Sequence, residues 1–330
     1  MKTLPRTTIS GLTAGKPMAS NRRWCARFGK WVLLAALCLS PLSASAWNAA
    51  GHRLSALIAW QHLDASTQVQ LSFILARHPD HERWIARAKG VDPELAAFLE
   101  ASTWPDDIKG DKRFYDEGNN APTTRLAGFP DMARHRHWHY IDRPLGHAPK
   151  HQTGDGELDK QLTLLAQIVG DRKATDQQRA YALPWLIHLV ADAHQPLHTV
   201  SRYDETGRGD EGGNRLSINN PFHPRRSSMN LHTYWDDLVG PPWLRGSYLE
   251  RAADTISTAN PIAPRTGNVQ SWINESWQIA RDNAYPPDED AVPTLTADFH
   301  ETAQTIARKR IAEAGYRLAA LLQSLLSPKP

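Results

Sequence analysis

The chain has 330 residues, of which 41% are hydrophobic and 22% are charged, a composition that is ordinary for a soluble globular protein. Such a length accommodates one large domain or two smaller ones. Internal repeats and low-complexity tracts are not evident. The formal net charge is +3, but the basic residues are unevenly distributed along the chain.

The first 46 residues differ from the rest of the chain. They contain seven Lys or Arg and no Asp, Glu or His. The basic stretch 22–30 precedes the apolar run 31–39, and the sequence Ser-Ala-Ser-Ala follows at residues 43–46. This arrangement is typical of a secretory signal peptide with a small-residue cleavage site. We therefore expect residues 1–46 to be a signal peptide and the protein to be exported, either periplasmic or secreted.

Two alternatives to this interpretation concern the same segment. An uncleaved membrane anchor is less favoured, because the apolar run 31–39 is too short to cross a bilayer comfortably. Met18 is an alternative start, because the basic part is longer than is usual for a signal peptide.

Cleavage after Ala46 would reverse the sign of the net charge. The 38 basic residues would fall by seven to 31, against 35 acidic residues, which gives a net charge of −4. A broadly basic surface for gripping nucleic acid is therefore not supported. Cys25 and Cys38 would leave with the segment, which excludes disulfide bonds and thiolate metal sites from the mature chain. All 15 histidines would remain.

Helical patterning dominates residues 47–330. Apolar side chains recur at helical spacing after His52, and the pattern returns in residues 158–169 and 181–190. Residues 294–326 form a last long segment that is rich in Ala, Leu and Arg. We therefore predict an all-α fold.

The remaining segments are predicted to be loops, apart from one short strand candidate at residues 215–218. Polar, Pro-rich or Gly-rich stretches occupy residues 109–130, 203–214 and 285–293. Long loops inside compact domains are often functional. None of them separates two independent cores, so we expect residues 47–330 to form a single domain.

Histidine and aspartate occur at helical spacing within one apolar segment. His188 and Asp192 are four residues apart, so on a helix they share one face. Polar groups without partners are costly in an apolar helix, and a metal ion would satisfy both. We expect Pro196 to end this helix and His198 to emerge just beyond it.

The same spacing returns in His232 and Asp236. A single pair of this kind is more often found on the surface, but two pairs and a third histidine favour a metal site. His52, Asp106 and His139 are further nitrogen and oxygen ligands upstream. Imidazole and carboxylate without thiolate suit catalytic zinc better than structural zinc. For each residue alone, a hydrogen-bonded position in the core or in a loop is the alternative.

The order of the motifs resembles that of the zinc-dependent single-strand nucleases of fungi and plants, the S-one/P-one family. The matching segments are residues 47–52 (Trp-Asn-Ala-Ala-Gly-His), 103–106 (Thr-Trp-Pro-Asp), 138–142 (Trp-His-Tyr-Ile-Asp), 188–192, 195–198 (Gln-Pro-Leu-His), 212–214 (Gly-Gly-Asn) and 230–236. The C-terminal third contributes only its helical pattern. The combination is specific, although Gly-Gly-Asn alone would mean little.

The resemblance implies a helical fold of the zinc-dependent phospholipase C and single-strand nuclease type, with three clustered Zn²⁺ ions. The implied ligands are Asp106, His139, His188 and Asp192 for one zinc, the amine and carbonyl of Trp47 with His52 and a shared Asp192 for the second, and His198, His232 and Asp236 for the third. The amine of Trp47 exists only after signal cleavage, and an α-amine with a pKa of about 8 can be held neutral by zinc.

The implied activity is that of an endonuclease that hydrolyses single-stranded DNA or RNA to 5′-phosphorylated products, with 3′-nucleotidase activity. Clustered cations lower the pKa of a shared water for in-line attack on phosphorus and stabilise the leaving 3′-oxygen. Nucleic acid or nucleotides are therefore the expected partners. No stable protein partner and no membrane span are implied for the mature chain.

Three further residues take roles through the resemblance. Asp142 is expected to orient the attacking water or a ligand, and an ordinary supporting partner of a ligand is the alternative. Lys109 stands where the family usually has arginine, so a cation remains for the phosphate without the arginine fork. A solvated loop residue is the alternative for Lys109. Tyr140 stands where the family has a base-stacking aromatic, with a core position as the alternative.

Two other functions are alternatives to the nuclease. A zinc-dependent phospholipase C has a related fold and also uses an N-terminal Trp, but it tends to have Glu at the position of Asp236. The Gly-Gly-Asn segment is nuclease-like, and no separate lipid-binding domain follows it. A zinc-binding protein without turnover is less consistent with the complete ligand set.

Overall fold

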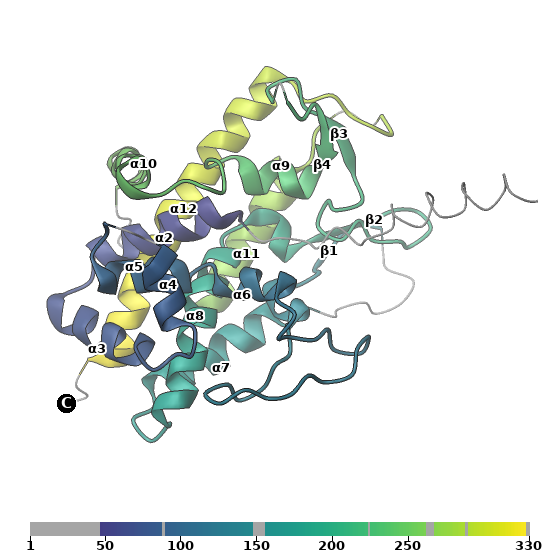
Figure 1. The fold of residues 1–330 in the computed structure, drawn as a ribbon. Coiled ribbons are helices and arrows are strands. Elements are labelled where there is room, and N and C mark those ends of the chain that lie inside the picture. The colour runs from purple at the N-terminus through teal and green to yellow at the C-terminus, as the bar shows by residue number, and fades with distance from the viewer. Residues whose placement is uncertain are drawn as a thin grey trace, which may run out of the picture. The chain divides into compact units, whose positions relative to one another are not determined.

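The structure of the protein, a computed structural model, describes residues 47–87, 90–147, 156–223, 225–261, 267–287 and 290–327. The predicted signal peptide at residues 1–46 lies outside the described residues. Helices dominate the described part, which confirms the predicted all-α fold (Figure 1). Within that part, no helix is both long and apolar enough to cross a lipid bilayer.

The α-helices from α2 to α6 follow one another with short connections, and a long segment then separates α6 from α7. They are α2 (Ala49–Gln61), α3 (Ala65–Leu75), α4 (His81–Arg87), α5 (Pro93–Ala101), α6 (Trp104–Asp107), α7 (Leu158–Gly170), α8 (Asp176–Asp192), α9 (Leu231–Asp237), α10 (Gly246–Ala259), α11 (Val269–Ile279) and α12 (Ala297–Leu326). Shorter turns are the 3₁₀ helices η1 (Ile108–Gly110), η2 (Arg136–His139) and η3 (Pro196–Thr199) and the π-helical turn η4 (Ala280–Ala284).

Short strands form two small sheets in the described part. They are β1 (Pro144–Gly146), which pairs in parallel with β2 (Ser201–Tyr203), and β3 (Ser217–Asn219), which pairs antiparallel with β4 (Ser228–Asn230). The strand predicted at residues 215–218 therefore begins later than expected. The N–H groups of Arg215 and Leu216 instead close a turn with preceding carbonyl groups.

The helices predicted at residues 158–169, 181–190 and 294–326 correspond to α7, α8 and α12. The segment predicted as a loop at residues 109–130 is irregular after η1. Helical periodicity was therefore a reliable signal wherever one face or the whole helix is buried.

The expected end of the central helix at Pro196 is wrong. Helix α8 ends at Asp192, and the chain then turns as the N–H groups of His194 and Gln195 bond to carbonyls in the last turn of the helix. Pro196 instead opens η3. Proline lacks an N–H group, so it is well suited to the first position of a new helical turn.

Helix α8 is buried along most of its length. It begins at a capping box in which Thr175 and Gln178 exchange side-chain and backbone hydrogen bonds. Every residue from Ala180 to Asp192 is buried, because α2, α3, α6, α7 and α12 pack around this helix (Figure 1). A helix that is apolar on all sides belongs in a core. His188 and Asp192 are therefore carried into the protein interior.

Helix α12 packs closely against α2, the helix that carries His52. At Gly315 of α12, a Cβ atom would lie 2.6 Å from Cγ2 of Ile58 and 2.9 Å from the carbonyl oxygen of Ser55. A side chain does not fit at these distances, so glycine allows the two helices to approach. This close packing fixes α2, and with it His52, against the core.

We expect Gly315→Ala to destabilise the protein, although alanine is the better helix former. Overpacking a well-packed core costs about 1–3 kcal/mol, and the contact with backbone leaves little room to relax, so the gain of up to ~1 kcal/mol in helix propensity should be outweighed. Ser324→Ala, on an exposed position of the same helix, should raise Tm slightly. Thermal unfolding measures both, and equal Tm values for the two variants would contradict the close approach.

Candidate metal centre

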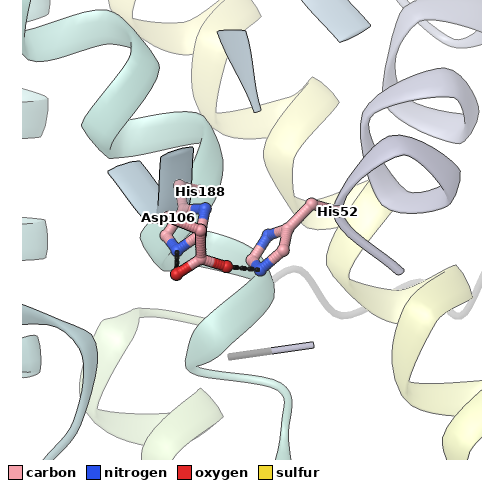
Figure 2. Close-up of side chains that lie close together, drawn as sticks. All are labelled: His52, Asp106 and His188. Atoms are coloured by element: carbon pink, nitrogen blue, oxygen red, sulfur yellow. Dashed lines mark ion pairs between the residues drawn. The ribbon is translucent and has the colours of Figure 1, made fainter. Parts of the chain in front are cut away.

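Helix α8 places His188 and Asp192 at the buried end of the helix, as the i, i+4 spacing predicted. Both side chains are 0% exposed. Three other elements bring partners to them: His52 comes from α2, Asp106 from α6 and His139 from the end of η2. Figure 2 shows His52, Asp106 and His188 directed toward one another. These five residues are referred to below as the first cluster.

Asp192 is the centre of the first cluster. Its Oδ2 lies 3.1 Å from Nδ1 of His139 and 3.3 Å from Nε2 of His188, and its Oδ1 lies 3.5 Å from Nε2 of His52. Asp106 faces the same three imidazoles at 3.8–3.9 Å. Atoms bound to one zinc at about 2 Å in a tetrahedron lie about 3.3 Å apart. The spacing therefore places these side chains within reach of common cations.

A second cluster consists of His198, His232 and Asp236. His198 lies on η3 just beyond α8, and the other two lie one turn apart on α9. The Nε2 atoms of His198 and His232 are 3.1 Å apart, and Oδ2 of Asp236 is 3.7 Å from Nε2 of His232. Gln195 donates from Nε2 to Oδ1 of Asp236 at 2.9 Å. This bond fixes the Asp236 carboxylate with Oδ2 on the side of His232.

Backbone carbonyls orient three of the histidines. Each of these rings donates from Nδ1 to a carbonyl oxygen at 2.6–2.8 Å: His188 to Ser102, His198 to His139 and His232 to Gly212. A carbonyl oxygen can only accept, so in a neutral ring Nε2 then carries the lone pair. Metal-binding histidines usually have this arrangement, because the second nitrogen is held by a hydrogen bond.

The facing ring nitrogens of the second cluster indicate a cation. In neutral His198 and His232, both Nδ1 protons are committed to carbonyls while the Nε2 atoms face each other at 3.1 Å. Two lone pairs at this distance repel unless a positive charge lies between them. In the first cluster, both ring nitrogens of His52 and Oδ1 of Asp192 are buried without a hydrogen-bond partner. Metal ions would satisfy these atoms, so the residues fit a metal centre.

Burial keeps several imidazoles in the neutral form that binds metals. Loss of solvation lowers the pKa of His52, His139 and His198 well below its usual value, and the charge of Lys109 lowers each pKa further. Burial also raises the pKa of Asp192 to about 6 and the pKa of Asp236 well above its usual range. Carboxylates in such surroundings stay ionised most easily beside a bound cation.

Lys109 forms part of the wall of the first cluster. Its side chain is 8% exposed, and its Nζ lies 2.6 Å from Oδ1 of Asp106. Burial would raise the pKa of the Asp106 carboxyl, but the charge and hydrogen bond of Lys109, together with the charges of His188 and His198, outweigh it and hold this pKa below its usual value. A solvated loop position for Lys109 is therefore wrong, because the ammonium is buried beside a candidate ligand.

Trp47 lies against the end of α8. Its buried indole N–H donates to the carbonyl of Ala191 at 3.1 Å, one residue before Asp192. The backbone N–H of Asn48 donates to the carbonyl of Asp236 at 3.4 Å. Trp47 is therefore next to residues of both clusters, while coordination through its amine stays a prediction.

Asp142 and Tyr140 border the clusters. Asp142 is partly exposed and follows Ile141, whose N–H donates to the carbonyl of His198 at 2.9 Å. Tyr140 is also partly exposed, which does not match the core alternative, and its hydroxyl lies 2.9 Å from Nδ1 of His137. Among the described residues, neither joins the groups that could hold a metal ion. Their roles toward water and bases stay predictions.

Sequence comparison places this arrangement in a known family. The family model for S1/P1 Nuclease matches residues 47–327, which include every residue of both clusters. The chain belongs to the S1/P1 nuclease family. It is 26% identical to Endonuclease 4 of Arabidopsis thaliana over 94% of this chain and 98% of that protein. It is 25% identical to Nuclease S1 of Aspergillus oryzae, over 44% and 54% of the two chains, and 26% identical to Nuclease P1 of Penicillium citrinum, over 46% and 60%.

Membership of the S1/P1 nuclease family establishes the class of activity. The protein is an enzyme, a hydrolase that cleaves nucleic acids, and the family is metal-dependent. The relatives named above are endonucleases and nucleases, so the comparisons provide no support for a phospholipase. The two clusters are the candidate metal sites for this activity.

Sequence reasoning missed the residues that orient the ligands. Gln195 and Gly212 were within recognised motifs, but their contacts with Asp236 and His232 could not be inferred from spacing. Gly212 has φ of +60°, and a Cβ there would lie 2.3 Å from the carbonyl oxygen of Leu197, which explains the glycine. Ser102 acts through its backbone carbonyl, so its side chain gives no signal in the sequence.

We expect Asp192→Asn to lower the metal content of the purified protein by about one ion or more per chain, because the carboxylate faces three imidazoles. Asp142→Asn should retain the metal content of wild type and affect turnover instead. Elemental analysis of both variants, with circular dichroism as a check on folding, measures the difference. Equal metal loss in the two variants would remove the distinction between a ligand and a neighbouring residue.

Proposed function

We propose that the protein is a zinc-dependent nuclease that hydrolyses single-stranded DNA or RNA to 5′-phosphorylated products and also acts as a 3′-nucleotidase. The observation that carries this proposal is the set of eight imidazole and carboxylate side chains in two clusters, of which all but Asp106 are buried. Nitrogen and oxygen ligands without thiolate suit catalytic zinc. The proposed ligands are His52, Asp106, His139, His188, Asp192, His198, His232 and Asp236, with the main chain of Trp47.

The charges of the site are consistent with more than one divalent cation. Asp106, Asp192 and Asp236 contribute three negative charges when ionised, and Lys109 returns one positive charge. His52, His139 and His198 contribute none in the neutral form favoured by burial. Several divalent ions would therefore leave the site positive and ready for an anionic phosphodiester. We propose three zinc ions, two in the first cluster and one in the second.

The side chains divide the chemical tasks between them. Bound zinc would act as a Lewis acid that activates water for attack at phosphorus and neutralises charge on the phosphate. Asp192 holds the first cluster together, and Lys109 presents an ammonium beside it that can steady a phosphate oxygen. Asp142, on the chain segment that leads away from His139, would accept a proton or orient the attacking water.

Preference for single strands would come from Tyr140. This residue directly follows the ligand His139, is partly exposed, and has its hydroxyl at 2.9 Å from His137. A base can stack on an aromatic ring only when it is unpaired and accessible. A tyrosine held beside the metal centre would thus favour a splayed single strand over a duplex.

Export and signal cleavage would complete the site. A peptide nitrogen is a poor ligand because its lone pair is delocalised into the carbonyl, whereas a terminal amine at Trp47 can bind zinc. The family match also begins at residue 47. We therefore propose that the enzyme becomes active after removal of residues 1–46 on export to the periplasm or the exterior.

Zinc removal tests the function directly. Dialysis against a strong chelator should abolish hydrolysis of single-stranded DNA and lower Tm by about 5 °C or more, because bound ions stabilise only the folded state. Zinc should restore both properties, whereas Mg²⁺ should not. Product analysis should show 5′-phosphates from single strands, with slower cleavage of duplex DNA and of a phospholipid control. Full turnover by zinc-free protein would overturn the proposal.

Lys109 provides a test of phosphate positioning. Lys109→Ala should lower kcat/KM for a dinucleotide by about 10-fold or more, as expected for a lost charge-assisted contact. Lys109→Arg should keep or raise it, because arginine adds a second directed donor. Zinc content measured in parallel separates a lost phosphate contact from a weakened Asp106 site. Unchanged kinetics in Lys109→Ala would mean that its ammonium does not contact substrate.

A further inference from the structure

The segment that leads into α2 is held by side chains that are not metal ligands. We propose that Asn48 and Arg53 form a clamp that positions the N-terminal residue Trp47 for metal binding, supported by the buried Glu100 and by Arg245. We refer to these four residues as the N-terminal clamp. The inference rests on the proposed zinc function, because it assigns positioning residues for one of the proposed ligands.

Asn48 joins the start of α2 to the end of α9. Its Oδ1 accepts hydrogen bonds from the N–H groups of Ala50 and Gly51 at 2.9 and 3.3 Å, which caps α2. Its Nδ2 donates to Oδ1 of Asp237 at 2.9 Å and to the carbonyl of Gly240 at 2.7 Å. The second pair of bonds is not needed for capping. It fixes the residue after Trp47 to the chain that follows the ligand Asp236.

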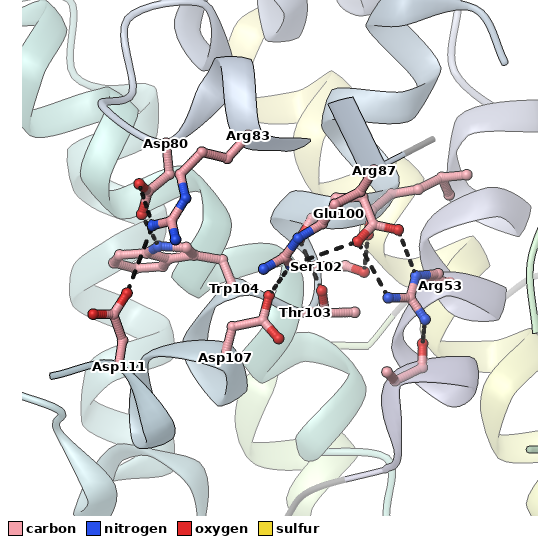
Figure 3. A network of polar contacts seen from close by, with 12 residues as sticks. Arg53, Asp80, Arg83, Arg87, Glu100, Ser102, Thr103, Trp104, Asp107 and Asp111 are labelled. Carbon is pink, nitrogen blue, oxygen red and sulfur yellow. Dashed lines mark hydrogen bonds and ion pairs between the residues drawn. The ribbon is translucent and has the colours of Figure 1, made fainter. Parts of the chain in front are cut away.

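Arg53 binds the same first turn of α2 through backbone carbonyls. The guanidinium is 3% exposed and donates from Nη1 to the carbonyls of Ala49 and Pro242 at 3.1 and 3.0 Å. The fork of Nε and Nη2 donates to the carboxylate of Glu100 at 2.8 and 3.2 Å. Figure 3 shows Arg53 and Glu100 facing each other. The first turn of α2 is therefore bound to α5 and to the chain before α10.

Glu100 connects the clamp to other ligands. Its carboxylate is 2% exposed and also accepts a fork from Arg245 at 3.0 and 3.1 Å. Burial would raise the pKa of Glu100, but the hydrogen bonds from Arg245 and Arg53 outweigh it and hold this pKa below its usual value. Two residues later, the carbonyl of Ser102 orients His188, and α6 with Asp106 follows. A shift of Glu100 would therefore change the positions of several proposed ligands.

The energetics favour a positioning role over a purely stabilising one. Buried ion pairs are often no more stabilising than apolar residues of similar size, but paired forks fix geometry tightly. Chain ends are usually poorly ordered unless they are tied down. A terminal amine that must reach a metal within a fraction of an ångström needs such ties, because ordering it on binding would cost affinity.

Asn48→Ser separates capping from clamping. Serine is as good an N-cap as asparagine, but it lacks the amide that donates to Asp237 and Gly240. In a chain that begins at Trp47, this variant should weaken one of the three zinc sites by about 10-fold or more, as measured by competition with a chromophoric chelator. Excess zinc should restore kcat, with KM unchanged. Arg53→Lys, which keeps the charge and loses the fork, should act on the same site.

Arg77→Lys serves as the matched control. Arg77 pairs with Asp176 at 2.8 Å, at the start of α8 and about 24 Å along the helix from Asp192. The same type of substitution there should leave all zinc affinities within about twofold of wild type, because substitutions at distant sites act independently to about that precision.

A chain with one extra residue before Trp47 tests the coupling. The terminal amine of this extended chain is displaced from the zinc site. In the extended chain, Asn48→Ser should therefore change the zinc affinity of that site by less than about twofold. The clamp would be overturned by any of three results. Asn48→Ser could bind zinc as tightly as wild type, it could weaken all zinc sites equally, or it could lose the same zinc affinity in the extended chain. A wild-type chain that binds no zinc would overturn the proposed function itself, so the two failures are distinguishable.

Discussion

The buried carboxylate of Asp192 is the constraint on which the rest of the site depends. It lies at the end of a helix that is surrounded by other helices, and imidazoles from α2, η2 and α8 approach it within 3.1–3.5 Å. A carboxylate is costly to bury unless a cation or strong donors compensate it. Asp192 therefore destabilises the core when it has no partner, and it is also the point at which metal ions can join separate segments of the chain.

The second cluster extends this arrangement to the residues that follow α8. After α8 ends, a turn and η3 bring His198 opposite His232 of α9. The short path between Asp192 and His198 keeps the two clusters adjacent. For a family of metal-dependent nucleases, adjacency is what matters, because attack and departure occur on opposite sides of one phosphorus atom.

A layer of groups behind the candidate ligands sets their orientation. Backbone carbonyls hold the Nδ1 atoms of His188, His198 and His232, and Gln195 holds Asp236. The N-terminal clamp does the same for the entry to α2. Such groups contribute little net stability, but each removes freedom that metal or substrate binding would otherwise have to restrict. The fold therefore preorganises the candidate ligands before metal binds.

The sequence by itself determined the helical class, the types of the candidate metal ligands and which of them share a helix face. Helical periodicity predicted α7, α8 and α12, and the i, i+4 spacing placed His188 with Asp192 because one helical turn fixes their common face. Spacing could not show that Lys109 is buried against Asp106, that α8 stops at Asp192, or that Ser102 and Gly212 orient histidines. Those features depend on contacts between residues far apart in sequence, or on backbone atoms that every residue shares. Only the tertiary structure could decide them, because packing brings such groups together without leaving a periodic signal in the chain.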